Sequence, residues 1–142
     1  MRAVVQRVKK AKVFDREISR GLVVFIAITH TDKEEDAKKL ADKILNLRIF
    51  PNEEGKFDFS VIDIKGEILV VSQFTLYGDC SKGRRPDFTR AAPPEKAKNL
   101  YEKFVEYIKN SGLKVVTGEF QSIMLVEIHN DGPVTLIVDT EK

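Results

Sequence analysis

Residues 21–28 have the sequence Gly-Leu-Val-Val-Phe-Ile-Ala-Ile, which is apolar throughout and rich in β-branched side chains. A run of this length and composition is typical of a strand that is buried on both faces of a sheet. Directly after it, Thr31-Asp32-Lys33-Glu34 has the form of a capping box, in which the threonine hydroxyl and the glutamate carboxylate satisfy free amide groups. A helix is therefore predicted to begin here and to pack on the buried strand.

The residues that follow support this helix, because their apolar side chains recur at helical spacing. They are Ala37, Leu40, Ala41, Ile44, Leu45 and Leu47. A second helix is predicted to open at Pro93-Pro94, where the missing N–H of proline is harmless, and Gly112 is its expected C-terminal cap. Its apolar stripe consists of Ala97, Leu100, Tyr101, Phe104, Val105 and Ile108.

Further strands are predicted from alternating or continuous apolar residues. They cover residues 2–14, 57–59, 68–76, 122–129 and 134–139, and a turn at Asn130-Asp131-Gly132-Pro133 separates the last two. The expected order of elements is therefore β-β-α-β-β-α-β-β. This order predicts an α+β fold, in which two helices pack on a largely antiparallel curled sheet or partial barrel.

Length and composition narrow the class of protein. A chain of 142 residues predicts one domain over residues 1–142, because two halves would each have too small a core. The net charge of +2 argues against a protein held on nucleic acid by bulk charge, although a local basic patch remains compatible with it. Charges interrupt residues 1–8 too early for a signal peptide, and no apolar run approaches the roughly 20 residues that cross a bilayer. We expect a cytoplasmic protein with no membrane partner.

The usual side chains of hydrolytic and metal sites are sparse. Cys80 is the single cysteine, so no internal disulfide and no Cys/His metal site is indicated, and no cofactor is expected. The two histidines, His30 and His129, stand apart from any nucleophile motif, and structural roles at a turn and a strand end are favoured for them. Chemistry must therefore be sought in less common arrangements.

Three segments differ from an ordinary scaffold. Ser72-Gln73-Phe74-Thr75 places polar groups at the end of an apolar strand, where they could surround a polar substrate and where free backbone N–H groups could face an oxyanion. The alternative is that these hydroxyl groups only bind neighbouring backbone. Asn130–Thr135 is ordinary turn sequence taken by itself. The basic loop, residues 81–90, is either a phosphate-binding segment with Phe88 available to stack on a base, or a solvated loop. Its cations are Lys82, Arg84, Arg85 and Arg90.

Taken together, these segments resemble the bacterial and eukaryotic D-aminoacyl-tRNA deacylase family, in its order and at its spacing over essentially the whole chain. The resemblance rests on Met1–Val8 at the start, Ser72–Leu76, Gly83–Phe88 and Asn130–Thr135. It implies hydrolysis of the ester between a D-amino acid, or glycine, and the terminal ribose of tRNA, which is chirality proofreading in translation. It also implies a homodimer, with aminoacylated tRNA as partner and no DNA.

The resemblance assigns roles to particular residues. Ser72, Gln73 and the amide of Phe74 would surround the ester, and Thr75 is the position sometimes assigned as nucleophile. We disfavour that role for Thr75, because the sequence shows no base that would activate its hydroxyl, and we expect the ribose 2′-hydroxyl to help activate water.

The second signature element is Gly132-Pro133-Val134-Thr135. The resemblance implies a cis Gly132-Pro133 wedge that enters the partner's active site and excludes L side chains, with Arg7 as its brace. Exclusion by shape works for every L side chain, whereas attraction would have to suit each D side chain separately.

The basic loop is expected to contact tRNA phosphates, and three alternatives stay open for the whole chain. They are a non-catalytic RNA-binding module, a deacylase whose main substrate is glycine on a non-cognate tRNA, and a purely structural dimerisation domain.

Overall fold

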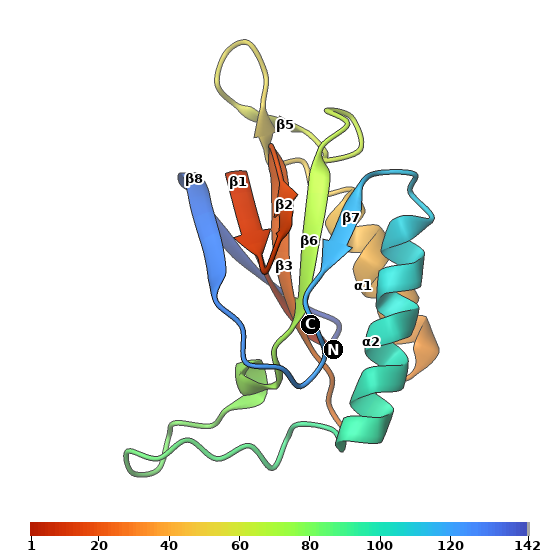
Figure 1. Ribbon diagram of the computed structural model, residues 1–142, viewed down its shortest axis with the longest axis vertical. Coiled ribbons are helices and arrows are strands. Elements are labelled where there is room, and N and C mark those ends of the chain that lie inside the picture. Colours follow the sequence, from red (N-terminus) through yellow and green to blue (C-terminus); the bar gives the residue numbers. More distant parts are fainter. Residues whose placement is uncertain (142) are drawn as a thin grey trace.

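The computed structural model describes residues 1–141, which form a six-stranded sheet, a small hairpin, two α-helices and one 3-10 turn (Figure 1). The strands of the large sheet are β1 (Arg2–Val13), β2 (Arg16–Ile18), β3 (Gly21–Ala27), β6 (Glu67–Ser72), β7 (Val115–Thr117) and β8 (Val126–Asp139). The hairpin pairs β4 (Phe50–Pro51) with β5 (Phe57–Phe59). The remaining elements are α1 (Glu34–Leu45), the 3-10 turn η1 (Phe74–Tyr77) and α2 (Pro94–Lys109).

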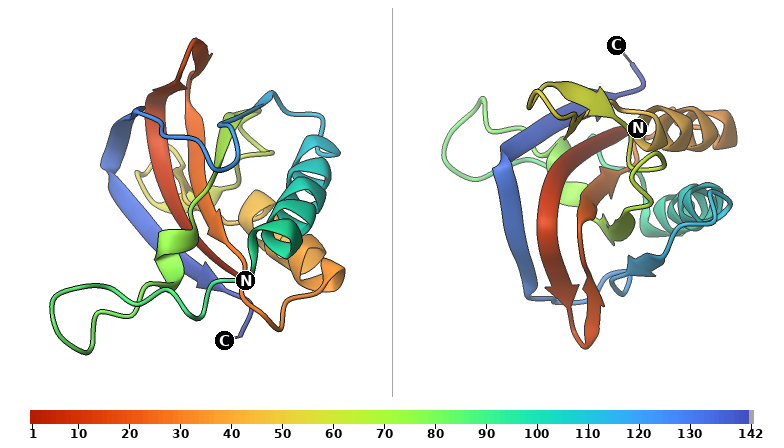
Figure 2. Two further views of the ribbon diagram at one scale, coloured as in Figure 1. Left: turned by 60° about the horizontal axis from the view of Figure 1, so that its bottom comes forward. Right: turned by 90° about the horizontal axis from the view of Figure 1, so that it is seen from above.

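The predicted α+β fold with a curled sheet is confirmed, and the sheet is mixed in direction. β1 pairs in antiparallel fashion with β2, β3 and β8, whereas β3–β6 and β6–β7 are parallel pairs. The parallel pairs arise because α1 and α2 lie in the connections between these strands and return the chain to the same end of the sheet. Seen from above, the sheet curls, with β8 at one side and both helices at the other (Figure 2).

Two apolar clusters lie on the two faces of this sheet. The larger one joins the sheet to both helices and includes Leu22, Leu40 and Phe104. The smaller one fills the other face with Val8, Val23 and neighbouring residues, and β8 residues close over it. β3 is buried on both faces, as its continuous apolar sequence predicts. No helix within residues 1–141 is long and apolar enough to cross a membrane.

The start of α1 differs from the predicted capping box. The helix begins at Glu34, and the side-chain carboxylate of Asp36 accepts the backbone N–H of Lys33 at 2.8 Å. Asp32 is buried instead, and it accepts the N-terminal ammonium group of Met1 at 2.6 Å. The capping residues are therefore Lys33 and Asp36 rather than the predicted Thr31 and Glu34, and Asp32 beside them binds the N-terminal charge. The second helix is confirmed, with Pro94 in its first turn.

The C-terminal region also departs from the prediction. Residues 122–125 are not a strand, and β8 runs without interruption from Val126 to Asp139 through the predicted turn at Asn130–Pro133. The register explains this continuity: Gln6 lies opposite Thr135 and Val8 opposite Asn130, so β8 uses more residues than β1 over this stretch. A proline is tolerated here because β8 is an edge strand, whose outer N–H groups need no partner in the sheet.

The predicted strand over residues 68–76 is shorter than its apolar pattern suggests. β6 ends at Ser72, and Phe74–Tyr77 turn into η1. β2, β4 and β7 are too short to have been predicted from periodicity, since each contains two or three residues.

Candidate active site

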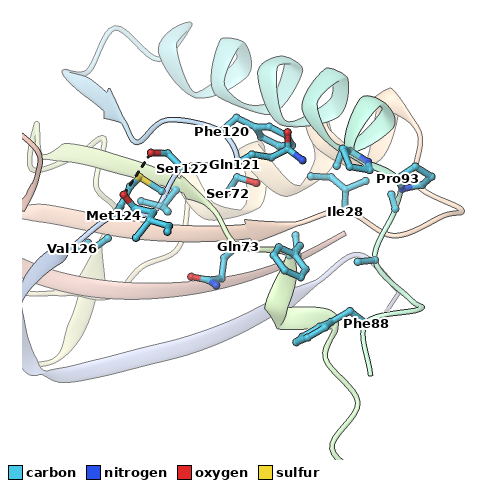
Figure 3. Close-up of a pocket in the computed structure, with 18 residues that line it drawn as sticks. Ile28, Ser72, Gln73, Phe88, Pro93, Phe120, Gln121, Ser122, Met124 and Val126 are labelled. Carbon is cyan, nitrogen blue, oxygen red and sulfur yellow. Dashed lines mark hydrogen bonds between the residues drawn. The ribbon is translucent and has the colours of Figure 1, made fainter. Parts of the chain in front are cut away.

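A cavity of about 760 Å³ lies beside the carboxyl end of β6 (Figure 3). Its walls come from segments that are far apart in sequence. They are residues 27–28 after β3, residues 71–74, parts of residues 88–97 leading into α2, and parts of residues 120–126 before β8. Most of the wall is apolar, and its volume is in the range of protein pockets that bind small molecules.

Ser72 and Gln73 supply polar groups to this wall, as do Gln121 and Ser122 (Figure 3). The backbone N–H of Gln73 donates to the carbonyl of Ile26 at 2.8 Å, which is the last contact of the parallel ladder before the chain turns into η1. The N–H groups of Phe74 and Thr75 have no hydrogen-bond partner within residues 1–141. An abrupt change from strand to 3-10 turn therefore leaves unpaired donors beside the cavity.

Thr75 is separated from the other residues of its motif. Its side chain is exposed and is not part of the cavity wall, and its hydroxyl accepts the side-chain amide of Gln73. No histidine or carboxylate of the described chain binds this hydroxyl. The structure thus places the threonine beside the cavity without the base that an attacking hydroxyl needs.

The second motif lies in the middle of β8, and the peptide bond between Gly132 and Pro133 is cis. Side chains brace this segment on both sides. Asn130 accepts the N–H of Val134 at 3.2 Å and donates to the Thr135 hydroxyl at 3.0 Å, and Gln6 donates to the same hydroxyl at 3.2 Å. Gly132 and Pro133 themselves are exposed. Our sequence reasoning missed the role of Asn130, although asparagine commonly bonds to backbone a few residues away in turns.

Arg7 lies beneath the same segment and is only 7% exposed. Its Nε donates to the carbonyl of Asp131 at 3.2 Å, and its Nη1 donates to the carbonyl of Ile49 at 2.7 Å. A side chain at Gly132 would place its Cβ 3.0 Å from Arg7 Nη2, and the φ of +122° at this position disfavours residues with a side chain. Glycine is therefore required where the backbone crosses the guanidinium group.

The two motifs do not meet within one chain. Ser72 pairs with Ile26 of β3, and Ile26 pairs with Ala3 of β1, so Ser72 lies at the level of Ala3. Gly132 lies at the level of Arg7, because the β8 residues on either side of it pair with Gln6 and Val8. A separation of about four residues along β1 corresponds to about 13 Å, and two further strands lie between β8 and β6. One small substrate therefore cannot contact both motifs of the same chain.

The basic loop projects away from the body of the molecule beside η1 (Figure 2). Its base is closed by a pair of backbone hydrogen bonds between Asp79 and Asp87, at 2.7 and 2.9 Å. Within residues 1–141, Lys82, Arg84 and Arg85 form no ion pair, whereas Arg90 lies 3.8 Å from the carboxylate of Glu141. The three cations at the tip are thus exposed and have no ion-pair partner among residues 1–141.

Phe88, which was predicted to be available for stacking on a base, lies at the base of the basic loop. Its ring packs edge-on against Phe74, with 5.1 Å between ring centres, and it lines the cavity (Figure 3). A side chain at Gly78 would lie 2.9 Å from this ring, so glycine leaves the space that Phe88 occupies. The basic loop is therefore packed directly on the Ser72–Phe74 segment.

Neither histidine belongs to the cavity. Nε2 of His30 donates to the carbonyl of Thr89 at 2.7 Å, which ties the end of the basic loop to the turn before α1. His129 lies opposite Lys10 on β1, outside both motifs. In the part of the chain that the structure describes, no group of three or more His, Cys, Asp or Glu side chains is arranged to hold a metal ion.

The chain is similar to known proteins over almost its whole length. Residues 4–139 match the family model described as D-Tyr-tRNA(Tyr) deacylase. The chain is 58% identical to the D-aminoacyl-tRNA deacylase of Thermotoga petrophila, in a match that covers 100% of this chain and 99% of that protein. It is also 58% identical to the D-aminoacyl-tRNA deacylase of Aquifex aeolicus, with the same coverage.

Solved structures show the same fold. A protein described as c-Myc DNA Unwinding Element Binding Protein has a TM-score of 0.92 and 41% identity, and the match covers 99% of both chains. A probable eukaryotic D-amino acid tRNA deacylase has a TM-score of 0.87 at 18% identity, with 96% of this chain and 97% of that chain covered. At this lower identity, the likeness concerns the fold alone.

Proposed function

Because the chain belongs to the D-Tyr-tRNA(Tyr) deacylase family, we propose that it hydrolyses the ester between a D-amino acid and the terminal ribose of tRNA. The observation that carries this proposal is the cavity beside β6, where Ser72, Gln73 and the free amide of Phe74 lie together. Glycine esterified to a non-cognate tRNA is included as a substrate, because glycine has no side chain that a chiral site can reject.

The reaction needs a site that stabilises charge on the ester carbonyl. Water adds to the carbonyl carbon, and the N–H of Phe74 donates to the oxygen that becomes negative. The ester C–O bond then breaks, the ribose oxygen takes a proton, and the amino acid leaves. The ribose 2′-hydroxyl assists the attacking water. The exposed Thr75 hydroxyl, held by Gln73, is not the nucleophile.

Chiral selection requires the second motif, and we place it in the active site of a second copy of this chain. Two observations support this arrangement. Gly132 and Pro133 are exposed, and about 13 Å along the strands separates them from the level of Ser72 in their own chain. An exposed wedge inserted from a partner would occupy the space of an L side chain, while its backbone carbonyls bind the amino group of the substrate. Arg7 holds the wedge from below.

β8 offers the edge that such a homodimer needs. Among the described residues it pairs with β1 alone, so its outer backbone groups have no strand partner. Ile137 on this strand is 73% exposed, an unusual place for a large apolar side chain on a free edge. We therefore propose a homodimer in which β8 lies at the interface.

The tRNA contacts belong to the basic loop. Lys82, Arg84 and Arg85 are exposed at its tip, while Phe88 at its base lines the cavity. Phosphates bound at the tip would thus place the end of the tRNA near the ester site. Contacts of this kind are largely indifferent to tRNA sequence and weaken with salt.

The test is the release of D-tyrosine and L-tyrosine from matched charged tRNAs by the wild type and Pro133→Ala. We expect the wild type to release only the D-amino acid at an appreciable rate. Pro133→Ala should narrow the ratio of D to L release, because the wedge loses its ring. Pro86→Ala in the basic loop is the matched control, and its D to L ratio should equal that of the wild type.

Other outcomes separate the alternatives. Retained tRNA binding with no release of either amino acid would indicate a non-catalytic RNA-binding module. Faster release of glycine than of D-tyrosine on several tRNAs would make glycyl-tRNA the main substrate. No effect on any aminoacyl-tRNA would leave only a structural role.

A further inference from the structure

Arg2, at the start of β1, contacts the end of η1 and is not among the residues that line the cavity. Its Nη1 donates to the carbonyl of Leu76 at 3.0 Å, and its Nε donates to Oδ2 of Asp139 at 2.9 Å. The Asp139 side chain is 3% exposed, so this ion pair is largely shielded from water. One guanidinium group therefore joins η1 to β8.

Tyr77 completes this contact. The guanidinium carbon of Arg2 lies 4.7 Å from the centre of the Tyr77 ring, and that of Arg90 lies 5.4 Å from it. Tyr77 is 1% exposed, which makes it the buried residue of η1. Burial, aided by the charges of Asp32 and Asp139, raises the pKa of the Tyr77 phenol, which keeps the ring neutral beneath the cations. We call Arg2, Tyr77, Arg90 and Asp139 the Arg2 cluster.

The charge state of Asp139 suits its place in this cluster. Burial alone would raise its pKa, but the N–H of Glu141, the side chain of Arg2 and the N-terminal charge together hold the pKa below its usual range. Asp139 is therefore an anion at neutral pH and keeps the Arg2 guanidinium oriented toward Leu76.

The other end of η1 follows Gln73, whose backbone N–H is bound to the carbonyl of Ile26, but its own side chains lie at the surface. Phe74 is 55% exposed and Thr75 is exposed, so burial does not fix their backbone. Their side-chain contacts are with Phe88 and Gln73, both of which belong to the cavity or its rim. The Phe74 N–H belongs to the same planar peptide group as the Gln73 carbonyl, which accepts the N–H of Leu76 at 3.2 Å. The direction of the Phe74 N–H therefore depends on where Leu76 is held.

We propose that Arg2 is a positioning residue of the ester site, because its contacts with Leu76 and Tyr77 hold η1 in the orientation that keeps the unpaired Phe74 amide beside the cavity. This inference rests on the proposed deacylase function. Arg2 touches neither the cavity nor the substrate, and it acts through η1 alone. Its position opposite Asp139 on β8 also ties η1 to the strand that carries the wedge.

Arginine is suited to this role in a way that lysine is not. The planar guanidinium group donates to a carbonyl and a carboxylate at once and stacks on an aromatic ring. A lysine at residue 2 would keep the charge but would hold only one acceptor firmly. The conservative substitution is therefore expected to restore the function in part.

The test compares Arg2→Met, Arg2→Lys and Lys114→Met in the full chain, with D-tyrosyl-tRNA as substrate. Lys114 is the matched control, because its Nζ donates to the carbonyl of Glu17 at 3.0 Å and lies near Glu67, at the other end of β6. The readouts are the steady-state kcat and KM, the melting temperature, and the NMR amide resonances of Phe74 and Thr75.

For Arg2→Met we expect kcat to fall by about tenfold or more, with KM changed by less than about twofold, because misplaced groups affect the transition state more than binding. The Phe74 and Thr75 amide resonances should shift in this variant. Arg2→Lys should recover part of kcat, and Lys114→Met should equal the wild type in kcat.

A folded Arg2→Met protein with wild-type kcat would overturn the inference, even if its melting temperature were lower. If Arg2→Met does not fold, Arg2→Lys decides: a fall in kcat of about threefold or more supports the inference, and wild-type kcat overturns it. Absence of D-tyrosine release by the wild type would instead overturn the proposed function, and the inference with it.

Discussion

The Ser72–Phe74 segment and the Gly132–Pro133 segment differ in how much of their surroundings one chain provides. The first lies in the wall of a cavity of about 760 Å³, with Phe88 packed against it and Arg2 fixing the turn that follows. The second is exposed on an edge strand, although Arg7 and Asn130 brace it from within. An exposed segment whose backbone is held in place by its own chain is suited to contact a partner molecule.

This difference separates two tasks in the proposed reaction. The Ser72–Phe74 segment would stabilise charge, which depends on donors held in place before the substrate arrives. The Gly132–Pro133 segment would exclude side chains, which depends on shape alone. Variants of the first should therefore change the rate on every substrate, and variants of the second should change the ratio of D to L release.

The largest expected effect is the loss of the Phe74 amide donor. Phe74→Pro removes this N–H at the first position of a 3-10 turn, where the fixed φ of proline is compatible with the backbone. We expect kcat to fall by about 100- to 1,000-fold with D-tyrosyl-tRNA, as for the loss of other oxyanion donors. Phe74→Ala keeps the N–H and is the control for the lost ring. Equal rates for the two variants would remove the amide from the mechanism.

The next effect concerns the source of the attacking group. A substrate that ends in 2′-deoxyadenosine should lose most of its turnover, by about 100-fold, because the assisting hydroxyl is gone. Thr75→Ala should keep a substantial part of the wild-type rate, since its hydroxyl already accepts the Gln73 amide and lacks a base. Single-turnover release of D-tyrosine measures both. The reverse pattern would make Thr75 the nucleophile.

A smaller effect is expected at the brace of the second segment. Arg7→Met removes donors from the carbonyl groups of Ile49 and Asp131, and the Ile49 contact is buried. The free energy of unfolding should fall by about 2 kcal/mol, which urea denaturation measures. The rate of D-tyrosine release divided by the rate of L-tyrosine release should fall, by no more than about tenfold. Lys103→Met is the matched control, because this lysine lies on α2 and its ion pairs are with Glu34 and Glu106, neither of which contacts Arg7. If folded Arg7→Met keeps the wild-type ratio, Arg7 has no part in chiral selection.

The smallest effect is expected from the basic loop, whose proposed role is to bind tRNA phosphates and not to select the amino acid. Replacing Lys82, Arg84 and Arg85 with alanine should weaken tRNA binding without altering the D to L ratio. The slope of log affinity against log salt should become shallower by about two, as expected for a few lost phosphate contacts. Filter binding at several salt concentrations measures this slope. An unchanged slope would place the tRNA on another surface.

The departures from the predicted secondary structure have a common origin in contacts between distant residues. The apolar run before Ser72 predicts a strand that continues to residue 76, yet the chain turns at Phe74 and buries Tyr77 beneath Arg2. Thr31 and Glu34 were expected to cap the first helix, whereas Lys33 and Asp36 lie at its cap and the neighbouring Asp32 is bound by the Met1 ammonium group. In both places a residue at the N-terminal end of the chain, Arg2 or Met1, contacts the segment, and the local pattern of side chains does not indicate such a partner.

The candidate site shows the same division. Ser72, Gln73 and Phe74 were predicted as one group, and the structure brings them to one cavity, because neighbours in sequence at a strand end remain neighbours in space. Of the wall residues between 120 and 126, those from 122 onward were predicted as part of a strand, and the contributions of Asn130 and Arg2 were not predicted at all. Their roles depend on hydrogen bonds whose partners are set by the register of β8 and the curl of the sheet.

By itself, the sequence determined the helices, the buried strands and the two motifs that place the chain in its family. Periodicity and residue type act over a few residues, so they can be interpreted without coordinates. Only the tertiary structure decided that Gly132–Pro133 lies within a continuous strand, far from Ser72, and that Arg2 holds the end of η1. The hydrogen bonds of Arg2, for example, join it to Leu76 and Asp139, which are 74 and 137 positions away in the sequence. Such pairings follow from strand order and register, which no local pattern of side chains specifies.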